Sequence, residues 1–167
     1  MNPSEVFYDT EGQPRSWDGS PIRDRLGVYA ICVSQGRVLL LWPAHAQTLA
    51  EFPGGSIKIG ESEEHALRPA FRAATGMDLP PDALISCLRT TLSHYTDAYE
   101  SGRFWNLRHV YCAADFSGEA CALNQEAWRG NDGSTLRWVA RADLPRVTFN
   151  FIHQKAAEFL MKGHDDE

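Results

Sequence analysis

Apolar residues gather into short runs from residue 26 onward, and these runs predict strands. Residues 26–33 are almost entirely apolar, as in a strand that is buried on both faces of a sheet. Gln35-Gly36 then marks a turn, and residues 37–42 form a second apolar run, so this pair predicts a β-hairpin. Three later runs predict further strands, at residues 84–92, 108–116 and 136–139.

A helix is predicted over residues 62–75. Ser62 suits the N-cap position, and Gly76 suits a left-handed residue that ends the helix. Pro69 lies inside this segment and lacks the amide hydrogen that a helix interior uses. We therefore expect a bend at or just before Pro69, at a cost of about 3 kcal/mol if the proline is truly interior.

A second helix is predicted from about residue 150 to residue 162, with Gly163 as its end. Residues 124–134 before the last strand are polar and are expected to form a loop. Strands with one internal and one terminal helix predict an α/β (α+β) fold, in which a mixed sheet is covered by helices.

The length of 167 residues fits one domain of ordinary size. Residues 26–163 are expected to form that domain, and residues 164–167 a short tail. Residues 1–25 differ in character, because they are rich in Asp, Gly, Pro and Ser. Two interpretations stay open for them: a loosely held extension, or an extra strand or hairpin laid on the core at a dimer contact.

Composition and charge exclude several classes of protein. Hydrophobic residues make up 43% and charged residues 23%, which excludes a disordered chain. The net charge of -6 argues against non-specific binding to nucleic acid or to anionic membranes. No apolar run approaches the roughly 20 residues of a membrane helix, and the N-terminus does not resemble a secretory signal. We therefore expect a cytoplasmic protein.

The four cysteines are expected to be buried, reduced thiols. No two of them are spaced as in a Cys-x-x-Cys metal or redox motif. A disulfide framework is not expected, because a domain of this size can be stable without one. Their positions are Cys32, Cys87, Cys112 and Cys121.

The segment from Gly54 to Met77 carries the most specific pattern in the chain. Five residues separate Gly55 from Glu61, and Gly76 and Met77 follow at a fixed distance. This spacing resembles the box of the Nudix hydrolase family. That box reads Gly, five residues, Glu, seven residues, then Arg-Glu-apolar-x-Glu-Glu-x-Gly-apolar. The resemblance implies a Nudix-type α/β/α sandwich, with the box helix after a Gly-Gly loop.

The departures from the box fall on its chemical positions. Pro69 stands where the family has Arg, and Ala70, Ala73 and Ala74 stand where it has Glu. In the family these glutamates hold divalent cations against a diphosphate, and alanine offers no oxygen donor. Only Glu61 remains of the box acids, and one carboxylate is a poor site for Mg²⁺. We therefore expect no metal cofactor; Mg²⁺ or Mn²⁺ enters only if the protein is still a hydrolase.

No catalytic residue is assigned, and Glu63 and Glu126 are weak candidates for a rebuilt acidic site. The polar and aromatic segment over residues 95–106 is expected to contact a ligand, since binding residues often lie on such loops. The candidates for ligand binding are Gly54, Gly55, Glu61, Arg89, Arg103 and Trp105.

Three functions are compatible with this sequence. The first is a catalytically impaired Nudix-fold protein that binds a nucleotide-like or other small phosphorylated ligand. The second is a Nudix hydrolase of nucleoside-diphosphate derivatives with a non-standard site. The third is a protein-interaction or dimerisation module, which leaves a homodimer open. No nucleic acid or membrane partner is expected.

Overall fold

The computed structural model describes residues 6–58, 60–79, 84–97, 102–115, 127–130 and 132–165. Its strands are β1 (Val6–Tyr8), β2 (Pro14–Ser16), β3 (Ile22–Ser34), β4 (Arg37–Trp42), β5 (Gly54–Ser56), β6 (Leu84–Tyr95), β7 (Phe104–Asp115), β8 (Ala127–Arg129) and β9 (Thr135–Ala140). The α-helices are α1 (Glu63–Thr75) and α2 (Gln154–Asp165), and two 3-10 helices are η1 (Arg141–Arg146) and η2 (Phe151–His153).

The strands form one mixed sheet in the order β2-β1-β6-β7-β3-β4-β9-β8, with β5 beside β3. The pairs β1–β6 and β3–β7 are parallel, whereas β3–β4, β6–β7 and β4–β9 are antiparallel. Gln35 and Gly36 both have positive φ in the turn between β3 and β4, so the predicted hairpin is confirmed.

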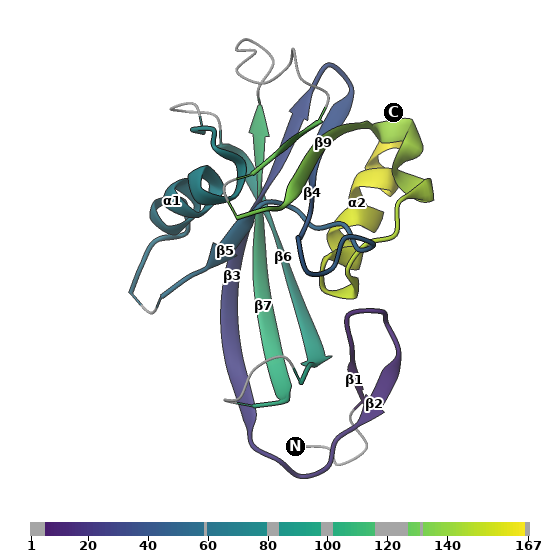
Figure 1. Cartoon of the computed structure of the whole chain (residues 1–167). Helices are drawn as coiled ribbons and strands as arrows, with labels where there is room; N and C mark the ends of the chain where they lie inside the picture. Colours follow the sequence, from purple (N-terminus) through teal and green to yellow (C-terminus); the bar gives the residue numbers. More distant parts are fainter. Residues whose placement is uncertain are drawn as a thin grey trace.

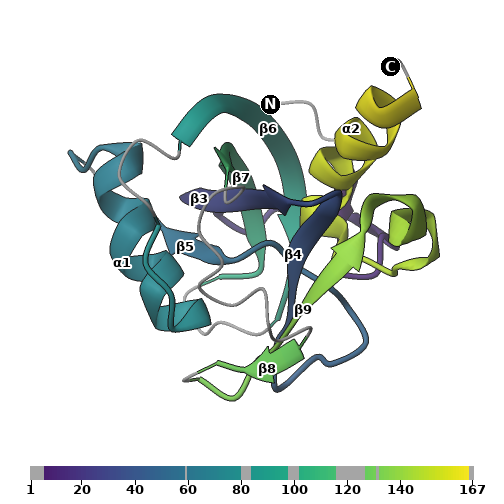
Figure 2. The ribbon, with the colours of Figure 1, turned by 90° about the horizontal axis from the view of Figure 1, so that it is seen from above.

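The two α-helices cover opposite faces of the sheet (Figures 1 and 2). Val28 and Ala30 of β3 lie in one core cluster with Phe71 of α1. Tyr29, between them, lies in a second cluster with Ala156 of α2. Because successive side chains of a strand point to opposite faces, β3 supplies both cores. The expected α/β/α sandwich with a mixed sheet is confirmed.

The central strands are longer than their apolar runs. β3 begins at Ile22 rather than at residue 26, and its first residues pair with β7 from Phe104 onward. This extension contains Arg23 and Asp24, so it carries no apolar signal. Backbone hydrogen bonds between strands do not depend on side-chain polarity, and therefore they continue the ladder past the apolar run.

Residues 6–16 form a hairpin at the edge of the sheet. β1 pairs with β2 and also runs beside β6, where Tyr8 is paired with His94. Phe7 is fully buried, and its ring meets that of Phe104 edge to face at 5.0 Å. The Asp9 carboxylate accepts hydrogen bonds from two backbone amides of the connecting turn. This segment is therefore packed on the core by its apolar side chains.

Both predicted ends of the box helix are confirmed. The Ser62 side chain accepts a hydrogen bond from the His65 amide at 3.1 Å, and Gly76 ends α1 with φ of 79°. The helix is continuous from Glu63 to Thr75 and passes through Pro69, which is exposed. A bend at Pro69 stays a prediction.

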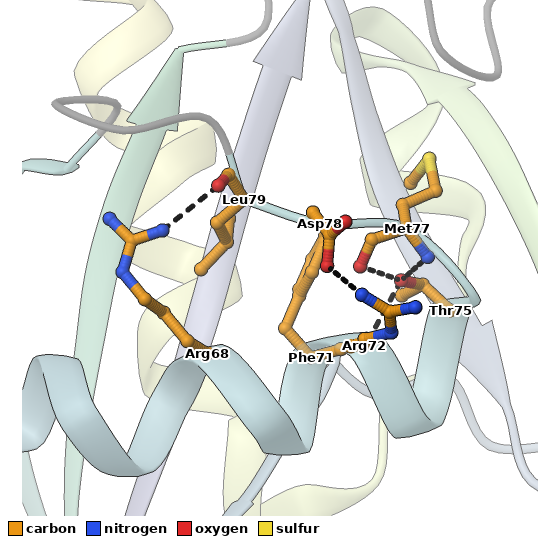
Figure 3. A network of polar contacts seen from close by, with 7 residues as sticks. All are labelled: Arg68, Phe71, Arg72, Thr75, Met77, Asp78 and Leu79. Carbon is orange, nitrogen blue, oxygen red and sulfur yellow. Dashed lines mark hydrogen bonds and ion pairs between the residues drawn. The ribbon is translucent and has the colours of Figure 1, made fainter.

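Polar contacts connect the end of α1 to the segment that follows it (Figure 3). The Thr75 hydroxyl donates to the Phe71 carbonyl at 2.8 Å and accepts from the Met77 amide at 3.0 Å. Arg68 donates to the Leu79 carbonyl at 2.9 Å. Thr75 is buried, so its two bonds satisfy groups that would otherwise lack partners.

Two elements differ from the sequence prediction near the C-terminus. β8 lies inside the segment predicted as a loop, where Trp128 pairs with Leu136 of β9. α2 continues to Asp165, so Gly163 as the end of the helix was wrong. Glycine costs about 1 kcal/mol inside a helix but does not forbid it. In the part of the chain that the structure describes, no helix has the length and apolar character needed to cross a membrane.

Gly54 allows β5 to lie against β3, and its replacement tests this packing. A Cβ on Gly54 would overlap the Val28 carbonyl oxygen and lie 2.6 Å from Tyr29 Cα. We expect Gly54→Ala to lower the free energy of unfolding by about 3 kcal/mol, measured by chemical denaturation. Gly55→Ala is the control, because among the described residues its Cβ would meet just the Ala70 methyl, at 3.2 Å, and a loss of about 1 kcal/mol is expected. Equal losses would contradict this account.

Candidate functional site

Gly54 and Gly55 lie in β5 and Glu61 lies in the loop that leads to α1, where its carboxylate is already hydrogen-bonded. Gly54 and Gly55 pair with Tyr29 and Val28 of β3. In the loop before α1, Glu61 Oε1 accepts a hydrogen bond from the Lys58 amide at 3.0 Å, and the Glu61 amide donates to the Lys58 carbonyl at 3.1 Å. The Glu61 carboxylate therefore closes its own loop.

The three alanines at the acid positions of the box differ in exposure. Ala73 is exposed, Ala70 is half-buried, and Ala74 is only 8% exposed. Ala74 belongs to the core cluster against which Trp128 packs, and the Trp128 indole donates to the Thr75 carbonyl at 2.9 Å. β8 thus packs beside the end of α1.

These residues do not fit a Mg²⁺ centre. Magnesium needs several oxygen ligands in near-octahedral geometry. Across the described ranges, no group of three or more His, Cys, Asp or Glu side chains is placed to hold a metal ion. Glu126, one of the two weak candidates, lies outside the described residues.

Arg89 and Glu63, both named as candidates, form an ion pair with each other. Arg89 Nη2 donates to Glu63 Oε1 at 2.8 Å, which connects β6 to the first turn of α1. The other carboxylate oxygen, Glu63 Oε2, is buried and has no hydrogen-bond partner among the described residues. The Arg89 guanidinium therefore pairs with an acid of α1, while most of its side chain stays exposed.

A polar cavity of about 230 Å³ lies on the face of the sheet that α2 covers. Trp105 and Thr96 line it, so both described ends of the predicted ligand-contacting segment contribute; residues 98–101 lie outside the described residues. Arg103 is exposed and does not line this cavity. The remaining lining residues are Thr10, Arg25, Tyr29, His45, Glu51, His94, Leu107, His109, Asn150 and Ile152.

Arg25 connects this cavity to the glycine strand. Its guanidinium donates to Ser56 Oγ at 2.8 and 3.2 Å, and Ser56 directly follows Gly55 in β5. A cationic side chain therefore lies between the cavity and the box loop. Arginine is well suited to a phosphate or carboxylate, because its planar donors can bind two oxygens at once.

Glu51 is the acid of the cavity. Its Oε2 accepts a hydrogen bond from Asn150 Nδ2 at 3.1 Å. Burial raises the pKa of the Glu51 carboxyl, and the Asn150 hydrogen bond and the nearby His45 and Arg25 side chains oppose that shift. Glu51 can therefore hold a proton at higher pH than an exposed glutamate.

His109, which lines the cavity, belongs to a cluster of buried aromatic and imidazole rings. The Tyr111 hydroxyl lies 3.2 Å from His109 Nδ1 and 2.9 Å from His153 Nδ1. Burial lowers the pKa of His109 to about 4 and that of His153 well below its ordinary value. Both imidazoles are therefore neutral near pH 7.

Trp105 is predicted from the sequence, whereas other polar residues of the cavity are not, among them Glu51, Asn150, Arg25 and His45. Glu51 precedes Gly54 by three residues and was given no role. Asn150 was noted only as the start of the last helix, although a side chain that can cap a helix also suits a ligand contact. The other two missed residues, Arg25 and His45, carry no local signal.

Comparison with solved structures identifies the fold. The E. coli dihydroneopterin triphosphate pyrophosphohydrolase superposes with a TM-score of 0.62 and 14% identity, over 86% of this chain and 99% of that chain. A MutT Nudix hydrolase from Burkholderia pseudomallei gives 0.52 and 24%, over 84% and 97%. The Nudix domain of Shewanella oneidensis NrtR, in complex with ADP ribose, gives 0.54 and 21%, over 80% and 83%.

The chain therefore has the Nudix fold. No protein-family model matches its sequence, and no curated protein matches it significantly. The fold agrees with the resemblance of the box segment, whose glycines and helix ends are retained.

Ala73 and Ala74 differ in burial, so replacing each with glutamate should change the stability of the protein by different amounts. We expect Ala74→Glu to lower the free energy of unfolding by at least about 2 kcal/mol, because the side chain would be forced into the core beside β8. Ala73→Glu, one residue away and exposed, should change it by less than about 0.5 kcal/mol. Denaturant titration measures both, and an equally stable Ala74→Glu protein would contradict the packing described for Ala74.

The low pKa of His109 predicts a loss of stability in acid. As the pH falls below about 6.5, His109 is protonated in the unfolded chain before it is protonated in the folded protein. The free energy of unfolding therefore falls until about pH 4. His109 alone accounts for up to about 3 kcal/mol of that fall. The lowered pKa of His153 also makes the free energy of unfolding fall in acid, whereas the raised pKa of Glu51 makes it rise. Denaturation from pH 7 to pH 4 should show a smaller fall for His109→Gln than for the unchanged protein. Parallel curves would refute the assignment.

Proposed function

We propose that this chain is a Nudix-family protein whose box no longer builds a metal centre, and that it binds a nucleotide-like phosphorylated ligand. One observation carries the proposal. The acid positions of α1 are alanines and Glu61 is bonded to its own loop, while the polar cavity beside Arg25 is kept. Loss of the metal ligands removes the means to activate water, but it does not remove a binding pocket.

The lining of the cavity supports a ligand with both a ring and an anionic group. Tyr29 and Trp105 provide aromatic surface for a base, and Arg25 provides a cation for a phosphate. The cavity of about 230 Å³ is smaller than the roughly 300–1,000 Å³ of typical ligand pockets. It suits one part of a nucleotide, with the rest extending toward β5. The ADP ribose bound by the NrtR domain is a ligand of this kind.

A second candidate is a Nudix hydrolase of nucleoside-diphosphate derivatives with a non-standard site. Glu51 favours it, because a carboxyl group with a raised pKa beside Asn150 can act as a general acid or base. Without a metal ion to offset the charge on the phosphate oxygens, the reaction would be slow.

The binding proposal predicts an Arg25-dependent, metal-independent interaction. Isothermal titration calorimetry with ADP ribose and with ADP, each with and without Mn²⁺, should give the same affinity in both conditions. Arg25→Gln should weaken binding at least about tenfold, since it removes a charge-assisted contact to phosphate. Arg146→Gln is the control, because Arg146 is exposed on η1 and does not line the cavity.

Three outcomes decide between the candidates. Equal losses of affinity in both arginine variants, or no binding by any nucleotide, would contradict the binding proposal. Turnover of about 1 per second or faster would place the protein in the ordinary enzyme range and favour the hydrolase. In that case Glu51→Gln and Glu61→Gln would show which acid the reaction uses.

A further inference from the structure

Cys87 and Cys112 lie directly opposite each other on two neighbouring strands. They are register partners in the antiparallel pair of β6 and β7, and their sulfur atoms are 3.3 Å apart. The two cysteines are 25 residues apart in sequence, so spacing alone does not predict this pairing. The expectation of buried thiols is confirmed for Cys32 and Cys112 and is wrong for Cys87, which is exposed. Cys121 lies outside the described residues.

The backbone at this pair suits a covalent bond. Directly opposed residues of antiparallel strands have Cα atoms about 4.5 or 5.5 Å apart. Both separations fall within the roughly 4.4–6.8 Å that disulfides span. The sulfur atoms of Cys87 and Cys112 already face each other, so bond formation needs a side-chain rotation rather than a movement of the strands.

The two thiols differ in access. Cys87 is open to solvent, whereas Cys112 is 2% exposed and lies in the core cluster beneath α1. Burial raises the pKa of the Cys112 thiol to about 12. A small oxidant therefore reaches Cys87 first, and Cys112 is held next to it as the thiol that reacts second.

We propose that Cys87 and Cys112 form an oxidisable dithiol, in which a hydroperoxide converts the pair into an intramolecular disulfide. The Cys87 sulfur attacks the peroxide O–O bond, becomes a sulfenic acid and releases one water or alcohol. The Cys112 sulfur then attacks the sulfenic sulfur, and the S–O bond breaks with loss of a second water. In sum, two thiols lose two electrons and two protons, and the hydroperoxide is reduced.

The disulfide would fix the part of the sheet that contacts the box helix. Arg89, two residues beyond Cys87, donates to Glu63 in the first turn of α1. Closing a loop of this length restricts the unfolded chain and so stabilises the folded protein. Oxidation should therefore raise the thermal midpoint by about 5 °C or more, and dithiothreitol should reverse the change.

The test uses hydrogen peroxide on the full chain. After treatment, the intact mass should fall by two hydrogen atoms, and a non-reducing peptide map should show the Cys87 and Cys112 peptides linked. Cys87→Ser should show neither the link nor the rise in thermal midpoint; Cys87 is exposed, so this variant is expected to fold, which circular dichroism checks. Cys121→Ser, which removes a different cysteine, is the control and should behave like the unchanged protein.

Three results would overturn the proposal. The first is oxidation of Cys87 to a sulfinic or sulfonic acid while Cys112 remains open to alkylation after unfolding. The second is a disulfide that joins Cys87 to Cys121 or to a second molecule. The third is a thermal midpoint that rises equally in Cys87→Ser, which would show that the stabilisation does not come from this pair.

Discussion

The parallel pairing of β3 with β7 is the constraint on which the rest of the structure depends. Twelve residue pairs, from Ile22 with Phe104 to Val33 with Asp115, fix the register of the two central strands. Because side chains alternate between faces, this register sends Val28 and Val110 toward α1 and sends Tyr29 and Tyr111 toward α2. A shift of one residue would send each side chain to the opposite face, so that neither core could pack as it does here.

The same register separates the box helix from the polar cavity. Arg25 and Leu107 are partners in the ladder, and both line the cavity with His109, two residues further along β7. The opposite face carries the apolar layer that packs on α1. Arg25 reaches from the cavity to Ser56 of β5, in the segment before the box helix. Ala74 of α1 and the polar lining of the cavity therefore lie on different faces of the sheet.

The sequence predicts features whose signal is local, and it misses those that arise from pairing across the chain. The caps of α1 at Ser62 and Gly76 and the β3–β4 turn follow from single-residue preferences, and the structure has all of them. The residues of β8 carry no comparable local signal, because this segment becomes a strand by pairing with β9. The cavity and the Cys87–Cys112 pair combine residues far apart in sequence, and only the strand register brings them together.

The box segment shows which of its residues the fold itself requires. Gly54 is required by the close approach of β5 to β3, whatever the protein binds, because any side chain would overlap the Val28 carbonyl. Gly76 is required by its positive φ at the end of α1. Gly76 is a position of the box and Gly54 directly precedes it, and both carry information about the fold. At the positions where the family pattern has acids this chain has alanines, and Ala74 is part of the core against which Trp128 packs. A glutamate at position 74 would therefore have to displace the packing between α1 and β8.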